Sequence, residues 1–144
     1  MKLRALILGL GFVACILSSR LVYAEPLRGH IGAASVWKSG WLDLDPPVDF
    51  RSGDIIRLKI GGTAERIIVR FLTVGESPGD PVGIEGGALP VQGADRTVDL
   101  TLKGDHPQTK QISVHGGSNP WGLYPLGENN GPATILSAER IGHQ

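Results

Sequence analysis

The fold class is decided by residues 55–74, which read IIRLKIGGTAERIIVRFLTV. In the first part, 55–60, isoleucine and leucine alternate with arginine and lysine, which is the two-residue period of a strand with one buried face. The second part, 66–74, is apolar on both faces and predicts a central strand that is covered on both sides. A Gly-Gly pair ends the first strand, so residues 61–65 are expected to join the two strands as a hairpin.

Short apolar runs that alternate with turn residues continue on both sides of this stretch. The further predicted strands are 35–38, 41–44, 82–84, 89–91, 97–102, 110–115 and 134–141. In the last of them, Leu136 and Ala138 are expected on one face, with Ile135 and Ile141 on the other. About seven or eight short strands separated by turns are typical of an all-β domain, either a two-sheet sandwich or a small barrel.

Glycine and proline are unusually frequent and together make up 31 of the 144 residues. They are the two poorest helix formers, so long helices are not expected. Apolar residues still make up 41% of the chain, which excludes a low-complexity linker. The composition therefore favours one folded domain with many turns.

The N-terminal segment, 1–24, has the pattern of a secretory signal peptide. Lys2 and Arg4 precede the apolar run 5–17, and a small residue, Ala24, follows at the expected cleavage point. The run has 13 residues, whereas a membrane-spanning helix needs about 20. We therefore expect cleavage after Ala24 and a secreted or periplasmic protein.

An alternative for this segment is a lipoprotein signal in which Cys15 is acylated. Residues 12–15 loosely resemble a lipoprotein cleavage box, although phenylalanine stands where leucine is usual. The apolar run also continues beyond the cysteine through Ile16 and Leu17, which favours cleavage after Ala24.

Cleavage after residue 24 would leave a chain with a loose leading segment, 25–32, and a single domain, 33–144. The chain from residue 25 has 11 basic and 14 acidic residues and contains no cysteine. Mild acidity argues against nucleic acid or an anionic membrane as a partner. We expect no membrane insertion once the leader is removed.

Motifs for metal, cofactor or nucleophilic chemistry are absent from the sequence. The four histidines are not spaced as zinc or iron ligand pairs, and neither a Gly-x-Ser-x-Gly elbow nor a phosphate-binding loop is present. Asp43, Asp45, Asp49 and Asp54 allow a calcium site, but aspartates beside two prolines are more typical of turns. We expect no enzyme activity and no cofactor.

The most unusual segment is 115–132, a long loop before the last predicted strand. Indole and phenol rings can stack on the C–H face of a sugar, and amide side chains can hydrogen-bond its hydroxyls. The predicted ligand-binding residues are Trp121, Tyr124, Asn119, Asn129, Asn130 and His115. Trp37 and Trp41, which fall near predicted loops, would extend such a platform. Alternatively, Trp121 and Tyr124 cap one end of the core.

Two segments carry a resemblance to a known group of domains. Residues 49–60 read DFRSGDIIRLKI, and residues 126–141 read LGENNGPATILSAERI. They resemble the galactose-binding-like jelly rolls, which include many carbohydrate-binding modules. The resemblance implies a jelly-roll-like antiparallel β-sandwich whose last strand returns to pair near the first.

These observations predict a non-catalytic binding module for a glycan or another polar ligand. The alternative is an extracytoplasmic protein-interaction or envelope accessory domain without a small-molecule ligand. Such a domain would use an exposed sheet face or edge, such as Arg57 and Lys59 beside Arg70.

Overall fold

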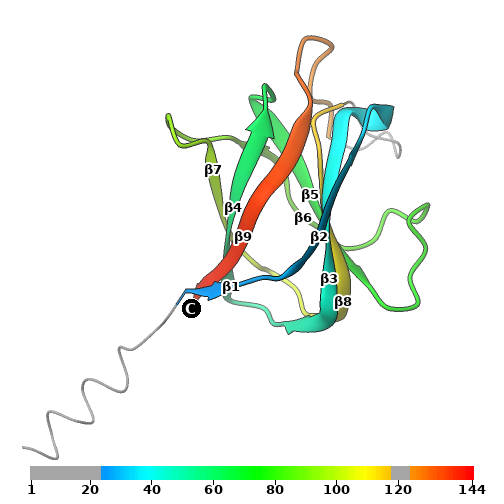
Figure 1. The fold of residues 1–144 in the computed structure, drawn as a ribbon, viewed down its shortest axis with the longest axis vertical. Coiled ribbons are helices and arrows are strands. Elements are labelled where there is room, and N and C mark those ends of the chain that lie inside the picture. The colour runs from blue at the N-terminus through cyan, green and yellow to red at the C-terminus, as the bar shows by residue number, and fades with distance from the viewer. Residues whose placement is uncertain (1–23, 118–123) are drawn as a thin grey trace, which may run out of the picture.

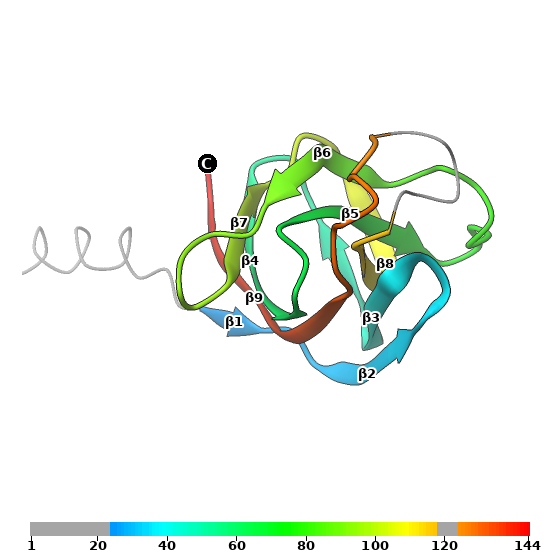
Figure 2. The same cartoon turned by 90° about the horizontal axis from the view of Figure 1, so that it is seen from above.

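The computed structural model describes residues 24–117 and 124–144, which form nine strands and one short 3-10 turn. The strands lie in two antiparallel sheets that pack against each other (Figures 1 and 2). The predicted antiparallel β-sandwich is therefore confirmed. The elements are β1 (Glu25–Pro26), β2 (Gly29–Ala34), η1 (Val36–Lys38), β3 (Ser39–Phe50), β4 (Asp54–Gly62), β5 (Arg66–Thr73), β6 (Ile84–Pro90), β7 (Thr97–Thr101), β8 (His106–His115) and β9 (Ala133–His143).

The strand order is that of a jelly roll with one added strand. One sheet has the order β1-β9-β4-β7, and the other has the order β2-β3-β8-β5-β6. Without the edge strand β2, eight strands remain. They pair as β1 with β9, β3 with β8, β4 with β7 and β5 with β6. This nested pairing is the jelly-roll arrangement. It places the C-terminus beside β1, as the sequence resemblance implied (Figure 1).

The core lies between the sheets and is built from the inward positions of alternating strands. Six of its members that are at most 1% exposed come from the stretch that predicted the fold: Ile56, Leu58, Ile60, Ile67, Val69 and Phe71. Phe71 also meets Phe50 edge to face, with ring centroids 5.3 Å apart. Full burial of each such side chain stabilises the fold by about 1.5–3 kcal/mol, so this stretch supplies a large part of the core energy.

The segment 61–65 does not close a hairpin, which corrects the prediction. β4 pairs with β7 and β9 in one sheet, whereas β5 pairs with β6 and β8 in the other. The chain thus crosses from one sheet to the other after Gly62. Adjacent apolar strands look the same in sequence whether they pair directly or face each other across a sandwich.

The beginning of the domain also differs from the sequence expectation. The leading segment, 25–32, forms β1 and much of β2, and so takes part in both sheets. The predicted strand 35–38 is a turn that contains η1, and β3 begins only at Ser39. The predicted signal peptide lies outside the described residues except for Ala24.

Two β-bulges changed the predicted alternation. In β9 the register shifts between Ile135 and Ser137, so that Ile135 and Ala138 are both buried while Leu136 is 54% exposed. A bulge adds one residue to a strand and moves the following side chains to the other face. Leu136 and Ala138 therefore do not share a face.

In β6, the register shift leaves Gly86 and Gly87 without partners on β5. Both glycines have positive φ values, of 76° and 67°, which residues with a side chain rarely adopt. One edge strand with a glycine bulge, β6, thus replaces the two short segments predicted at 82–84 and 89–91; it contains residue 84 of the first and residues 89–90 of the second.

Candidate functional site

An open groove of about 470 Å³ lies on the outer face of the five-stranded sheet. We call it the sheet groove. Its floor and walls come from three strands, the 3-10 turn and the loop 74–83. The lining residues are Trp37, Ser39, Trp41, Arg70, Pro78, Gly79, Gln111, Ser113 and His115.

The floor of the sheet groove is one row of residues across the sheet. Trp41 on β3 pairs with Ser113 on β8, and Ser113 pairs in turn with Arg70 on β5. On the other side, Trp41 pairs with Gly32 on the edge strand β2. A methyl group on Gly32 would lie 2.5 Å from the indole of Trp41, so the ring lies over the glycine backbone. A glycine at this position therefore makes room for the ring.

Trp37 projects from a backbone conformation that is rare for its residue type. Its φ is 60°, and that of the next residue, Lys38, is 48°. Two backbone hydrogen bonds hold this turn, from the N–H of Gly117 to the carbonyl of Trp37 and from the N–H of Gly116 to the carbonyl of Lys38. The side of Trp37 that faces away from the protein stays open, because the residue is 46% exposed.

Arg70 holds the loop that forms the opposite wall. Its guanidinium donates hydrogen bonds of 2.6–3.0 Å to four carbonyl oxygens of that loop: those of Ser77, Pro78, Asp80 and Val82. Burial lowers the pKa of Arg70, while the charges of Glu76 and Asp80 act in the opposite direction. Arg70 therefore acts as a clamp that positions Pro78 and Gly79 at the edge of the groove.

The remaining polar groups of the sheet groove are neutral side chains. Ser113 Oγ lies 3.2 Å from His115 Nε2, the spacing of a hydrogen bond. Burial lowers the pKa of His115 to about 4, and the charge of Arg70 acts in the same direction. The imidazole is thus uncharged at neutral pH and a weak proton acceptor. It is therefore poorly suited to activate Ser113 as a nucleophile.

The sequence-predicted site residues are spread over several places. Asn119 and Trp121 lie outside the described residues. His115 lines the sheet groove together with Trp37 and Trp41, which the sequence analysis named as extensions of a platform. Asn129 is exposed in a separate small groove beside Arg66 and Glu128.

Asn130 is buried and its amide is fully used within the chain. Its Oδ1 accepts hydrogen bonds from the backbone N–H groups of Glu65 and Arg66, at 2.9 and 3.2 Å. Its Nδ2 donates to the carbonyl oxygens of Arg66 and Gly116, both at 2.7 Å. These four bonds tie the loop before β9 to the start of β5 and the end of β8.

Tyr124 is 44% exposed and lines a second groove at the edge of the sandwich, near the glycine bulge of β6. A methyl group on Gly87 would lie 3.2 Å from its ring, so the tyrosine rests against the bulge. The same groove contains a buried pair in which His106 Nε2 lies 2.6 Å from Glu85 Oε2. The Glu85 carboxylate also accepts hydrogen bonds from the backbone of Lys103 and Gly104, so it holds the turn after β7.

The aspartates proposed for calcium or turn chemistry have separate partners. Asp43 accepts a hydrogen bond from Gln111, Asp49 accepts two from Gln108, and Asp54 bonds Arg140 and His143. Within 24–117 and 124–144, no group of three or more acidic, histidine or cysteine side chains could hold a metal ion.

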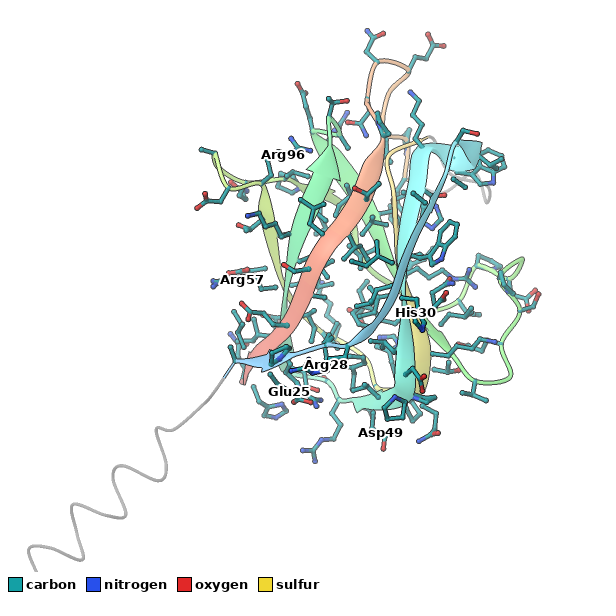
Figure 3. The ribbon with its side chains drawn as sticks, viewed as in Figure 1. Glu25, Arg28, His30, Asp49, Arg57 and Arg96 are labelled. Atoms are coloured by element: carbon teal, nitrogen blue, oxygen red, sulfur yellow. The ribbon has the colours of Figure 1, made fainter. Side chains whose placement is uncertain are left out.

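The basic surface suggested for a protein partner does not form. Arg57 and Lys59 lie on β4 in the four-stranded sheet, where Arg57 is paired with Asp99. Figure 3 shows Arg57 on one side of the sandwich and His30, on β2, on the other. Arg70 belongs to the five-stranded sheet and is only 3% exposed.

Sequence reasoning did not assemble the sheet groove, although part of its signal was present. The alternation over 110–115 puts Ile112 and Val114 inward, so that Gln111, Ser113 and His115 must face outward. What was missing is the register that sets Trp41 beside Ser113, which depends on pairing between distant strands.

No known protein-family model, curated protein or solved structure matches this chain. Within the described ranges, no helix has the length and apolar character needed to cross a bilayer.

Proposed function

We propose that this protein is a secreted or periplasmic, non-catalytic binding module whose sheet groove holds a glycan. The observation that carries the proposal is the row formed by Trp41, Ser113 and Arg70, together with the exposed Trp37, which lines the same groove. The cleavable leader expected at 1–24 supports an extracytoplasmic location. The resemblance to the galactose-binding-like group stays a prediction.

Sugar recognition fits the chemistry of these side chains. Flat apolar ring faces can pack against the C–H groups of a pyranose, while serine and glutamine side chains can bond its hydroxyls. The groove is open rather than enclosed, so it suits a segment of a chain better than a small molecule that must be buried on all sides. Loop 74–83, held by Arg70, gives the groove a fixed wall.

The test is binding of the exported protein to an array of immobilised glycans. The informative variant is Trp37→Gly, because glycine accepts the positive φ of this position and the lost ring is largely exposed. Trp41→Ala removes the second ring, and Trp121→Ala tests the loop site predicted from sequence. Lys59→Ala, an exposed change on the other sheet, is the matched control.

We expect Trp37→Gly and Trp41→Ala to lose binding by at least about tenfold, with unchanged far-UV circular dichroism. Lys59→Ala should bind as the parent protein does. Loss of binding in Trp121→Ala alone would move the site to the loop. Absence of binding to every glycan, with a folded protein, would refute the proposal.

A second candidate is protein binding at the edge strand β2. Among the residues that the structure describes, this strand has a neighbour on one side only; it carries no acidic or basic residue apart from His30 and exposes Ile31 by 56%. Edges of this kind are templates for strand addition. An envelope protein bound in this way should be released by Ile31→Lys, a change that leaves the sheet groove intact.

A further inference from the structure

Two polar side chains of the sheet groove, Ser39 and Gln111, present hydrogen-bond acceptors to it. The Ser39 hydroxyl donates its hydrogen to the carbonyl of Val36 at 2.8 Å, which leaves the lone pairs of Ser39 Oγ. Gln111 Nε2 donates to Asp43 Oδ1 at 2.9 Å. Because a carboxylate only accepts, this bond also fixes the orientation of the Gln111 amide.

The orientation of Gln111 leaves its Oε1 as an acceptor at the groove. Among the described residues, no donor is bonded to that oxygen. The contact between Ser113 and His115 uses one of the two hydrogens that the hydroxyl and the neutral imidazole carry, whichever atom donates it. The acceptors Gln111 Oε1 and Ser39 Oγ therefore need hydrogens from the ligand, and hydroxyl groups supply them.

The charges around the groove do not form a receptor for a ligand carboxylate. Four hydrogen bonds of Arg70 go to the carbonyl oxygens of loop 74–83. Asp43 lies directly across from Gln111 in the sheet register, so its negative charge borders the acceptor Oε1. A ligand carboxylate or sulfate placed against Gln111 Oε1 would meet an acceptor and the like charge of Asp43 rather than a donor.

We propose that the sheet groove selects neutral, hydroxyl-rich glycans and discriminates against glycans that carry carboxylate or sulfate groups. This inference rests on the proposed function and names its ligand class. The indole faces of Trp37 and Trp41 provide the stacking surface, and Gln111 Oε1 and Ser39 Oγ accept hydrogen bonds from sugar hydroxyls.

The test compares matched polymers that differ in charge but share a backbone. Native gels are cast with hydroxyethylcellulose or carboxymethylcellulose, and with dextran or carboxymethyldextran, and migration is compared with polymer-free gels. Salt at about 150 mM limits the reach of charge to about 8 Å, so nonspecific ionic binding is weak. The proteins are the parent, Trp37→Gly, Lys59→Ala and Gln111→Lys.

We expect at least one neutral polymer to retard the parent and Lys59→Ala but not Trp37→Gly. The carboxymethyl partner of that polymer should bind the parent at least about tenfold more weakly. Gln111→Lys places an ammonium beside Asp43 and replaces an acceptor with donors, so it should narrow or reverse this preference.

Equal or stronger retardation of the parent by the carboxymethyl form, lost in Trp37→Gly, would overturn the inference while keeping the proposed function. A preference unchanged in Gln111→Lys would overturn the role of that side chain as an acceptor. Retardation by none of the four polymers would overturn the inference, whereas the glycan proposal is overturned only if the glycan array also shows no binding.

Discussion

Removal of the Asn130 side chain should destabilise the fold far more than its place in a loop suggests. The four amide hydrogen bonds all go to backbone groups of other segments, and Asn130 is only 7% exposed. Each such bond contributes about 0.5–1.5 kcal/mol net, so Asn130→Ala should lower the free energy of unfolding by about 2–6 kcal/mol. That is a large share of the roughly 5–15 kcal/mol typical of a domain.

The measurement is urea unfolding followed by far-UV circular dichroism, with the free energy obtained by linear extrapolation. Asn129→Ala is the matched control, since that neighbour is exposed and should change stability by no more than about 0.5 kcal/mol. Asn130→Asp keeps the size but turns a carboxylate oxygen toward the carbonyls of Arg66 and Gly116, so it should also destabilise.

A loss below about 1 kcal/mol in Asn130→Ala would refute this reasoning, because the four bonds would then contribute little. Glycan binding gives a second check. Asn130 does not line the sheet groove, so the folded fraction of Asn130→Ala should bind like the parent. A stable variant that has lost binding would make Asn130 a ligand residue, as the sequence had suggested.

Three further changes have directions that follow from the structure. Gly83→Ala should lower the free energy of unfolding in urea by at least about 2 kcal/mol, because φ is 76° and the new methyl group would lie 1.9 Å from Phe71 O. Gly93→Ala, which places its methyl group in open space, should lower it by less. The pKa of His115 is about 6.5 in the unfolded chain and falls to about 4 on folding. Between these two pH values the unfolded chain binds a proton that the folded protein does not. Lowering the pH from 6.5 to 4 should therefore reduce the free energy of unfolding by up to about 3 kcal/mol. His115→Gln should flatten this limb of the stability-against-pH curve, and an unchanged slope would contradict the assignment. Burial raises the pKa of Asp54, but hydrogen bonds from Arg51, His143 and Arg140 outweigh it, so the net pKa is lowered. The stabilisation that results is present above about pH 4 and is lost as the pH falls further. Asp54→Asn should remove this loss of stability at low pH.

The parts of the fold that the sequence predicted well are those set by local alternation. The strands at 54–62 and 66–73 were found because a buried face leaves a period of two, or a continuous apolar run, in the sequence. The neighbour of each strand is not local information. The sequence therefore predicted a hairpin at 61–65, where the chain instead crosses between sheets.

The errors in detail also have local physical causes. The bulge in β9 falls at Leu136 and Ser137, which are ordinary strand residues. A search for two-residue alternation therefore cannot detect it. The glycine bulge of β6 was visible only as a turn-like Gly-Gly pair between two short apolar runs. Asn130 was predicted to bind a ligand because its actual partners cannot be recognised in the sequence. They are backbone groups of segments that are distant along the chain.

The strained turn at Trp37 gives an independent reason to place binding at the sheet groove. Residues other than glycine lose about 1–2 kcal/mol in the left-handed region, and here two of them occur in succession. Packing does not explain the tryptophan, because it is nearly half exposed. The turn is held from outside, by the N–H groups of Gly116 and Gly117 and by a 2.6 Å bond from Lys38 Nζ to the carbonyl of Asn130. A conformation that costs stability, supports an exposed aromatic ring and is fixed by surrounding bonds is expected where the ring is needed for contact with a ligand.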